Sequence, residues 1–308
     1  TQFRNWYSQA GTPVVKVEGQ FDEAAETFTL IVEQTCPPTP GQEEKAPFHL
    51  PLAVGLLDPD GHDVSFEADD VAAVIRDGQS FTNVLNVREA RTEFKLRGVS
   101  VPVVPSLLRG FSAPVKLAYN YSRDDLMFLA SHDSDGFNRW EAGQRLGASV
   151  MQDLVEDANA AIDPRLLSVF ETILTEAVER GTDPLFDKAM AANMLSLPPE
   201  SYLAELSDGM IDVEGIHHAR EQLRSTVARS LQGLLLSTYK MNTSSEPYQP
   251  DGASVARRAL RNAALTYLML PDDTQAIPVA NDQVRNSNNM TDTAAALRAL
   301  VNCPSEAA

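Results

Sequence analysis

The stretch that decides the fold runs from Val101 to Leu146 and reads VPVVPSLLRGFSAPVKLAYNYSRDDLMFLASHDSDGFNRWEAGQRL. Its first half has the pattern of two sheet strands, whereas its second half begins a long run with helical periodicity. The chain before this stretch is rich in strand patterns, and the chain after it is rich in helix patterns. The stretch therefore predicts a junction between two kinds of domain.

Residues 13–122 are predicted to form a small immunoglobulin-like β-sandwich. Short strands that are separated by turn signals, with no helix between them, are typical of this architecture. Residues 1–12 are predicted to be a linker from a missing upstream domain. They hold two aromatic residues close to a Gly, with a Pro directly after them. Strands are expected over residues 14–21, 27–34, 49–57, 80–87, 91–96, 103–111 and 115–121.

Residues 123–135 are predicted to be a junction, and residues 136–308 an all-α domain. Asp163 and Asp183 each precede a proline, which places a capping carboxylate before Pro at the first helical position. Short loops between helices indicate a bundle or an αα-superhelix, and the absence of a clean repeat leaves both open. Helices are expected over residues 137–157, 164–180, 184–196, 213–239, 252–270 and 291–302.

The two ends of the chain suggest a longer protein. It begins with Thr1 instead of an initiator Met, which is consistent with processing or with a piece of something larger. Its last five residues, 304–308, do not resemble the polar capping repeat that closes a superhelix. We therefore expect the helical domain to be truncated at its C-terminus.

Composition excludes several classes of function. With 43 acidic and 25 basic residues the chain has a net charge of −18, which repels nucleic acid and anionic membranes. No apolar run approaches the ~20 residues that span a bilayer. Cys36 and Cys303 lie far apart, so neither a zinc knuckle nor a redox pair is available. Two idle thiols fit a reducing, cytoplasmic location.

Histidines supply the nearest candidates for metal or acid–base chemistry. His217 and His218 are adjacent, and neighbours on a helix point about 100° apart, so they cannot share one ion. We interpret them as part of a solvated helix face. The run His132-Asp133-Ser134-Asp135 also gathers possible ligands, but it lies where Ser134 or Asp135 can cap the next helix.

Two further clusters have a simpler interpretation than a binding site. Asp58, Asp60 and His62 resemble the start of a calcium loop, but Asp69 stands where a bidentate Glu is needed, so a tight turn is favoured. Three arginines, Arg257, Arg258 and Arg261, predict a salt-bridged helix surface. No nucleophile elbow, P-loop or dinucleotide motif is present, so we predict no catalytic and no metal-binding residue in this chain.

A series of short motifs, taken in order, resembles the bacterial, proteobacterial-type branch of the zinc aminopeptidase N family, which are gluzincin metallopeptidases. The resemblance covers essentially the whole chain. The residues that carry it are assigned structural roles, with capping and packing favoured over a cavity-facing role for the last group. They are Trp6, Gln9, Gly11 and Pro13; Phe111 to Leu117; Asp135, Phe137, Arg139 and Trp140; Arg258 to Ala263; and Asn289, Met290, Thr291 and Asp292.

This resemblance implies a four-part parent enzyme, of which the chain is the β-sandwich and the first part of the helical domain. The zinc motif HExxH and the GxMEN segment of the family are absent from these residues. Zinc, peptide substrates and the catalytic domain would thus belong to the missing part of the same chain. The sandwich is expected to act as a spacer and the helical domain to cover the active site, while substrate-binding residues stay unknown.

Two alternatives of other classes stay open from the sequence. One is a stand-alone adaptor, in which a β-sandwich and an α-solenoid bind other proteins. The other is a separate enzyme that uses His132, or His217 and His218. Metal bound at these histidines would favour the second alternative.

Overall fold

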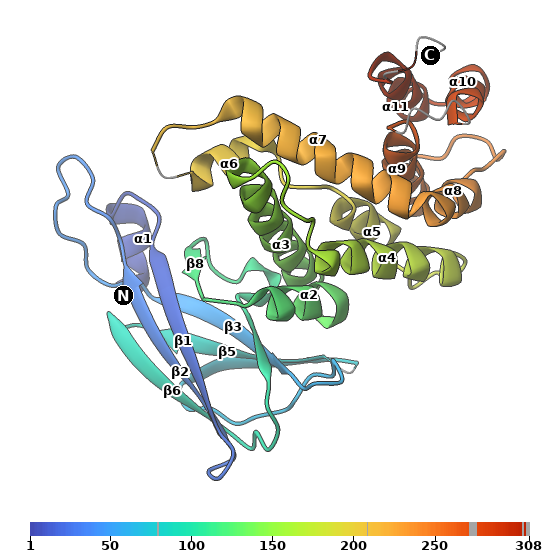
Figure 1. Cartoon of the computed structure of the whole chain (residues 1–308). Helices are drawn as coiled ribbons and strands as arrows, with labels where there is room; N and C mark the ends of the chain where they lie inside the picture. Colours follow the sequence, from blue (N-terminus) through green and yellow to red (C-terminus); the bar gives the residue numbers. More distant parts are fainter. Residues whose placement is uncertain (79, 208, 271–275, 304, 306–308) are drawn as a thin grey trace. The chain divides into compact units, whose positions relative to one another are not determined.

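The computed structural model describes residues 1–308 except 79, 208, 271–275, 304 and 306–308. The chain divides into two compact units, Thr1–Ala142 and Gly143–Ala308 (Figure 1). The first unit is mainly β and the second is all α among its described residues. The predicted order of a β-sandwich followed by helices is therefore confirmed.

Two four-stranded sheets form the first unit, in the orders β6-β2-β1-β8 and β4-β5-β3-β7. Neighbouring strands are antiparallel except for β1 and β8, which run parallel. Within the described residues the strands are β1 Val14–Asp22, β2 Thr27–Thr35, β3 Leu50–Leu57, β4 Val71–Asp77, β5 Ser80–Val87, β6 Arg91–Arg97, β7 Val104–Leu107 and β8 Lys116–Ala118.

The sandwich core follows from period-2 alternation. Along β2, Phe28, Leu30 and Val32 are buried while the residues between them are only half-buried. Because successive side chains in a strand point to opposite faces, one face of this sheet is apolar and packs on the other sheet. Gln34 ends the buried face, and its amide is satisfied by the backbone of Phe48 and by the carbonyl of Glu89.

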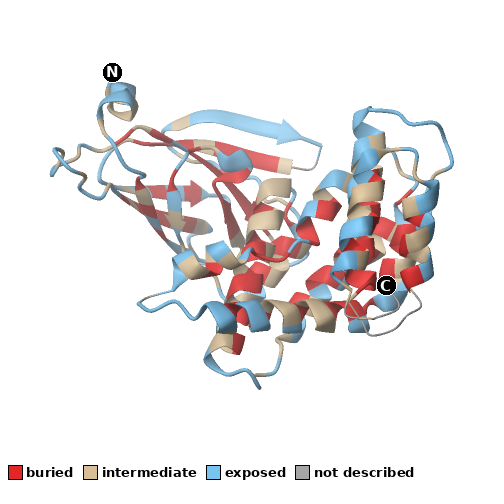
Figure 2. Cartoon of the chain, turned by 90° about the horizontal axis from the view of Figure 1, so that it is seen from above, coloured by how far each residue is buried: buried red, intermediate tan, exposed pale blue. Residues whose placement is uncertain are grey.

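Two parts of the β region differ from the prediction. The strand β4 was not predicted, and nearly every residue in it is exposed, as the pale-blue strand of Figure 2 shows. A strand without a buried face lacks the apolar–polar alternation by which strands are recognised. The strand expected over 103–111 ends at Leu107, because Leu108 has φ 60° and turns the chain.

Short helices flank the sandwich within the first unit. The N-terminal residues form a 3-10 turn, η1 Gln2–Arg4, and a helix, α1 Asn5–Ser8. Most of the expected junction is a helix, α2 Arg123–His132, which begins at a capping box: the Ser122 hydroxyl accepts from Asp125 N, and the Asp125 carboxylate accepts from Ser122 N.

The second unit consists of packed helices. Helix α9 contacts α5, α7, α8, α10 and α11, so it is central to this unit. The boundary between the units falls within α3. The described helices from that point are α3 Gly136–Glu156, α4 Pro164–Glu179, α5 Lys188–Met194, α6 Glu200–Leu206, α7 Val213–Ser230, α8 Gln232–Met241, α9 Gly252–Leu268, α10 Ala276–Asn286 and α11 Met290–Val301.

Local capping explains where several helices begin, and it corrects one prediction. Asp163 caps α4 with Pro164 at the first position, as predicted. Asp183 does not start a helix: it holds a turn by accepting from Leu185 N, and α5 begins later with Asp187 as its cap. The expected helix 213–239 is two helices that break at Leu231.

Helices α6 and α10 were not predicted. The expected truncated end of the helical domain includes residues 304 and 306–308, which lie outside the described residues. No helix in the described part of the chain is both long and apolar enough to cross a bilayer.

Candidate functional site

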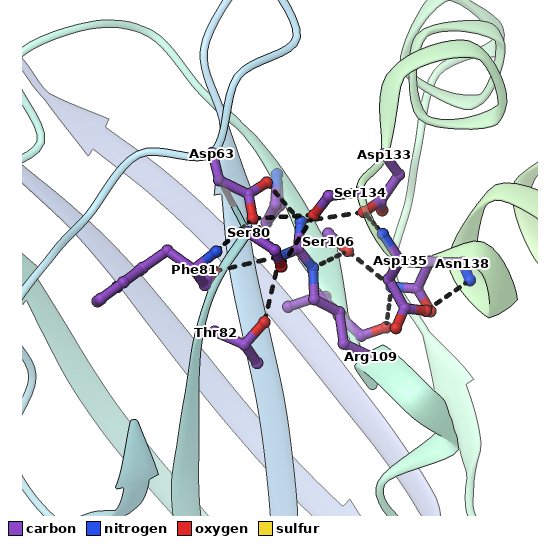
Figure 3. Close-up of polar contacts among 12 residues, drawn as sticks. Asp63, Ser80, Phe81, Thr82, Ser106, Arg109, Asp133, Ser134, Asp135 and Asn138 are labelled. Carbon is purple, nitrogen blue, oxygen red and sulfur yellow. Dashed lines mark hydrogen bonds and ion pairs between the residues drawn. The ribbon is translucent and has the colours of Figure 1, made fainter. Parts of the chain in front are cut away.

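The first candidate site is a buried charge cluster around Arg109 in the β unit (Figure 3). The Arg109 side chain is 3% exposed. It donates to both carboxylate oxygens of Asp63, at 2.7 and 2.9 Å, and to Asp133 Oδ1 at 3.0 Å. Its Nε donates to Ser106 Oγ at 2.8 Å. One guanidinium therefore joins two carboxylates that lie far apart in the sequence.

Backbone geometry places Arg109 in this position. The chain leaves β7 and enters the left-handed region at Leu108, so the next side chain turns inward over β3. β3 makes room with a glycine, since a Cβ on Gly55 would lie only 2.0 Å from Arg109 Cζ. Without that glycine the guanidinium would have to move.

The turn between α2 and α3 completes the cluster. Ser134 Oγ donates to Asp63 Oδ2 at 2.9 Å, and Asp135 Oδ2 accepts from Gly110 N at 3.0 Å. Asp135 Oδ1 also accepts from Asn138 N at 2.9 Å. This is the capping role predicted for Asp135, and Ser134 contacts Asp63 instead of capping.

Burial affects the two carboxylates differently. Burial favours a higher pKa for Asp63, but the hydrogen bonds from Arg109 and Phe81 N and the charge of Arg109 hold that pKa below its usual value. Burial raises the pKa of Asp133 to about 6, against the charge of Arg109. Asp133 Oδ2 is buried and has no hydrogen-bond partner among the described residues. The two pKa values differ because the Asp63 carboxylate accepts more hydrogen bonds than the Asp133 carboxylate does.

The Arg109 cluster is a cross-link between segments that lie far apart in the sequence. All three guanidinium nitrogens bond to atoms of the chain. The cluster therefore ties the loop after β3, the end of β7 and the α2–α3 turn together, as buried networks of hydrogen-bonded charges do. Sequence analysis did not single out Arg109 or Asp63. The sequence feature that could have indicated a buried arginine is the position of Arg109 directly after the apolar run that ends at Leu108.

Residues of the predicted aromatic motif lie beside this cluster. Phe137 packs between Phe111 and Trp140, with ring centroids 5.4 and 5.8 Å away. Arg139 Nε donates to the carbonyl of Ala130 at 3.2 Å. These contacts lie within the first unit, so these motif residues shape the end of the sandwich and the first turns of α3.

The N-terminal motif holds the first residues against the sandwich. Trp6 packs on Phe48 with ring centroids 4.6 Å apart and ring planes tilted by 48°, and its Nε1 donates to His49 O. The Gln9 amide both donates to and accepts from the backbone of Ala46. Gly11 has φ +95°, and Pro13 O accepts from Lys116 N at the parallel β1–β8 pair.

Two later motifs meet in a second polar cluster, in the helical unit. Asp292 accepts from Asn262 Nδ2 at 2.8 Å and from Asn289 Nδ2 at 3.0 Å, and it pairs with Arg261 at 3.4 Å. Arg261 also donates to Tyr239 Oη at 2.9 Å. Residues about thirty positions apart in the sequence thus form one buried network across α8, α9 and α11.

The remaining motif residues have capping or surface positions. Asn289 caps α11 by accepting from Asp292 N at 2.9 Å. Met290 is 79% exposed, and Thr291 is exposed beside it. Asn289 thus has the expected capping position and the Asp292 side chain lies in the buried network, whereas Met290 is too exposed to fill the helix packing that was also expected of it.

Arg258 and Arg261 differ from the predicted basic surface, because both are buried. Arg258 lies over the Tyr248 ring, 5.1 Å from its centroid, and donates to Gln249 O. Periodicity alone did not reveal this, since arginines are normally exposed.

The histidine candidates are dispersed. His217 pairs with Glu200 at 2.9 Å on an exposed surface, at the edge of a groove of about 620 Å³ between α7, α9 and α11. In the described part of the chain, one group of metal-ligating side chains meets in space: Asp58, Asp60 and His62, whose ligand atoms lie within 4.8 Å of one another.

This group does not fit the zinc site that the family resemblance implies. One oxygen of Asp58 already accepts from the backbone N–H groups of Asp60 and His62, which closes the predicted tight turn. The His62 side chain is 68% exposed. Zinc ligands are usually held by a second layer of hydrogen bonds, so no chemical step is assigned to this turn.

The fold defines a class of protein with an immunoglobulin-like domain followed by helical repeats. Residues 11–120 match the family model described as "Domain of unknown function (DUF3458) Ig-like fold", and residues 123–308 match "Domain of unknown function (DUF3458_C) ARM repeats". The chain belongs to this DUF3458 family. The description of ARM repeats agrees with the superhelix that was one of the two predicted helical architectures.

Curated relatives carry the name aminopeptidase N. The chain is 36% identical over 305 residues to the protein of Escherichia coli strain K12, 34% over 304 residues to that of Haemophilus influenzae, and 34% over 300 residues to that of Caulobacter vibrioides. These matches cover 98%, 96% and 97% of this chain. The chain spans about a third of the length of each relative. The predicted resemblance to aminopeptidase N is confirmed.

A solved structure shows the same fold. The crystal structure of Legionella pneumophila aminopeptidase A in complex with aspartic acid matches with a TM-score of 0.78 and 24% identity. The match covers 98% of this chain and 33% of that one.

Proposed function

We propose that this chain is the accessory region of a zinc-dependent aminopeptidase that releases N-terminal residues from peptides. The observation that carries the proposal is the match of nearly the whole chain to one third of three aminopeptidase N proteins. Catalytic and zinc-binding residues would lie in the other two thirds. The chain alone is then inactive, and zinc and peptide substrates belong to the longer protein.

In this proposal the β-sandwich is a spacer and the helical domain covers the active site of a catalytic domain in the same polypeptide. Residues 1–12 are the connection to that domain, residues 13–122 the sandwich, 123–135 the junction and 136–308 the beginning of the helical domain. The Arg109 cluster supports a spacer role, since two buried carboxylates on one guanidinium rigidify the end of the sandwich. The longer protein is proposed to be cytoplasmic.

The first experiment measures bound zinc and the hydrolysis of an alanine amide by the purified chain. We expect neither zinc nor turnover, because the ligands and the general base of a metallopeptidase are proposed to lie elsewhere. Stoichiometric zinc together with turnover would overturn the proposal.

A second experiment separates the accessory region from the stand-alone adaptor. An antibody raised against this chain should detect, in the source cells, a protein about three times the 33.6 kDa of the chain. That protein should release N-terminal alanine after immunoprecipitation. A single species of 33.6 kDa would instead favour the adaptor.

A further inference from the structure

A small polar pocket lies in the helical unit beside the Arg261–Asp292 network. It has a volume of about 20 Å³ and lies among the end of α8, the α8–α9 loop, the start of α9 and the α10–α11 turn. That volume accommodates one atom of water size. Three arginines from α9 line it: Arg257, Arg258 and Arg261.

Among the described residues that line this pocket, three arginines face two carboxylates, those of Glu246 and Asp292. Arg261 is 8% exposed, its ion pair with Asp292 is long at 3.4 Å, and its Nε is buried without a hydrogen-bond partner among the described residues. Among the described residues Arg257 pairs with Glu246, at 3.5 Å, and the Glu246 side chain is 74% exposed. An exposed carboxylate is screened by water and compensates little. A buried guanidinium normally has hydrogen-bonding partners for its nitrogens, so a partner for Arg261 Nε is missing.

An unpaired acceptor lines the same pocket. Asn242 is 2% exposed, and its Nδ2 donates to Thr238 O, whereas its Oδ1 is buried and has no hydrogen-bond partner in the described part of the chain. A ligand that fills the pocket must therefore accept a hydrogen bond from an arginine and donate one to an amide oxygen. The pocket also adjoins the N-terminus of α11, whose backbone N–H groups favour negative charge.

We propose that this pocket receives one protonated terminal oxygen of a phosphate group, as in the monoanion of inorganic phosphate or of a phosphomonoester. Phosphate oxygens accept charge-assisted hydrogen bonds from arginines, and near neutral pH a fraction of inorganic phosphate still carries one ionisable proton; for a phosphomonoester, whose second pKa is about 6, that fraction is smaller. The hydroxyl oxygen of the phosphate donates a hydrogen bond to Asn242 Oδ1 and accepts one from a guanidinium N–H. Sulfate satisfies only the arginines, because it has no proton to donate at neutral pH. The site lies outside any role that the proposed peptidase function assigns to this chain.

Isothermal titration of the whole chain with inorganic phosphate, at ionic strength held constant with sodium chloride, tests the site. We expect saturable binding and a rise in the unfolding midpoint, because a ligand that binds only the folded state stabilises it. Sulfate should bind more weakly than phosphate. Absence of phosphate binding, or equal binding of sulfate, would overturn the proposal and leave ordered water as the occupant.

Two variants locate the binding. Arg257→Gln removes a half-exposed guanidinium that lines the pocket, and its only described ion pair is the weak one with Glu246, so the chain should still fold. It should weaken phosphate binding about tenfold, the effect of one charge-assisted hydrogen bond. Arg285→Gln removes the same charge from an exposed position on α10 outside the pocket and should leave binding unchanged. An equal loss of phosphate affinity in both variants would mean that phosphate is attracted by the general positive charge of the arginines, and it would contradict a defined site.

Discussion

The guanidinium of Arg109 occupies the space that a side chain at Gly55 would fill: a Cβ there would lie 2.0 Å from Arg109 Cζ and 2.4 Å from Nε. Gly55 lies inside β3, where glycine normally costs stability. Its presence is explained by the close approach of the buried arginine, which bonds to Asp63 and Asp133.

Gly55→Ala should therefore destabilise the chain strongly. The new methyl group would displace Arg109 from two buried carboxylates, and breaking buried ion pairs costs about 3–5 kcal/mol. Urea unfolding followed by circular dichroism measures the free energy of unfolding. Gly143→Ala is the matched control, because no atom lies within 4 Å of its new Cβ and alanine favours helix. A Gly55→Ala variant as stable as the parent would refute this packing argument.

The stability of the first unit should depend on the protonation of Asp133. Its pKa is raised from 3.8 to about 6, so between these values the folded state holds a proton that the unfolded state has lost. Stability contributed by this group is therefore present at low pH and is lost as the pH rises through this window, by about 3 kcal/mol.

Asp133→Asn should remove that part of the pH dependence, since the amide does not titrate. The measurement is the difference in the free energy of unfolding between parent and variant from pH 4 to pH 7. Asp77→Asn removes the same charge from an exposed position of the same unit, and its pH profile should follow that of the parent. Parallel profiles for parent and Asp133→Asn would show that Asp133 does not bind its proton in this range.

Removing Asp292 should destabilise the helical unit. Asp292→Ala would leave Arg261 buried without its carboxylate and would also take the acceptor from Asn262 and Asn289, so a loss of about 3–5 kcal/mol is expected. Asp282→Ala removes an exposed carboxylate that bonds to Asn286, and surface changes of this kind stay within about 0.5 kcal/mol. The measurement is the midpoint of thermal unfolding of the two variants. Similar midpoints for both would contradict a central role for Asp292.

Trp6 should hold the N-terminal segment against the sandwich. Trp6→Ala removes the ring contact with Phe48 and the hydrogen bond to His49 O, so residues 2–11 should open and exchange their amide hydrogens faster. Hydrogen–deuterium exchange with mass spectrometry measures this. Tyr7→Ala is the control, because Tyr7 is an aromatic neighbour that is 84% exposed, and its exchange should match the parent. Unchanged protection in Trp6→Ala would assign the anchoring to other contacts.

The sequence predicted correctly those strands and helices whose own residues show clear alternation or a capping residue. β2 alternates clearly, and Asp163-Pro164 starts α4 as expected. The missed strand β4 is exposed almost throughout, and the short helix α6 has no side-chain cap at its start. The capping box at Ser122 was a readable signal for α2 that the prediction did not use.

The family motifs were visible in the sequence, but their physical roles were not. Arg261, Asn262, Asn289 and Asp292 were noted as parts of two separate motifs, and only the structure joins them in one network. Arg258 and Arg261 were expected on a surface, and packing of α9 against its neighbours buries them.

The sequence by itself determined the order of a β-sandwich and a helical domain, because strand and helix periodicities are properties of neighbouring residues. It also determined the resemblance to aminopeptidase N. Only the tertiary structure decided that Arg109 pairs with Asp63 and Asp133, which lie 46 and 24 residues away. Such partners are chosen by the close approach of strands and turns, which no local pattern encodes.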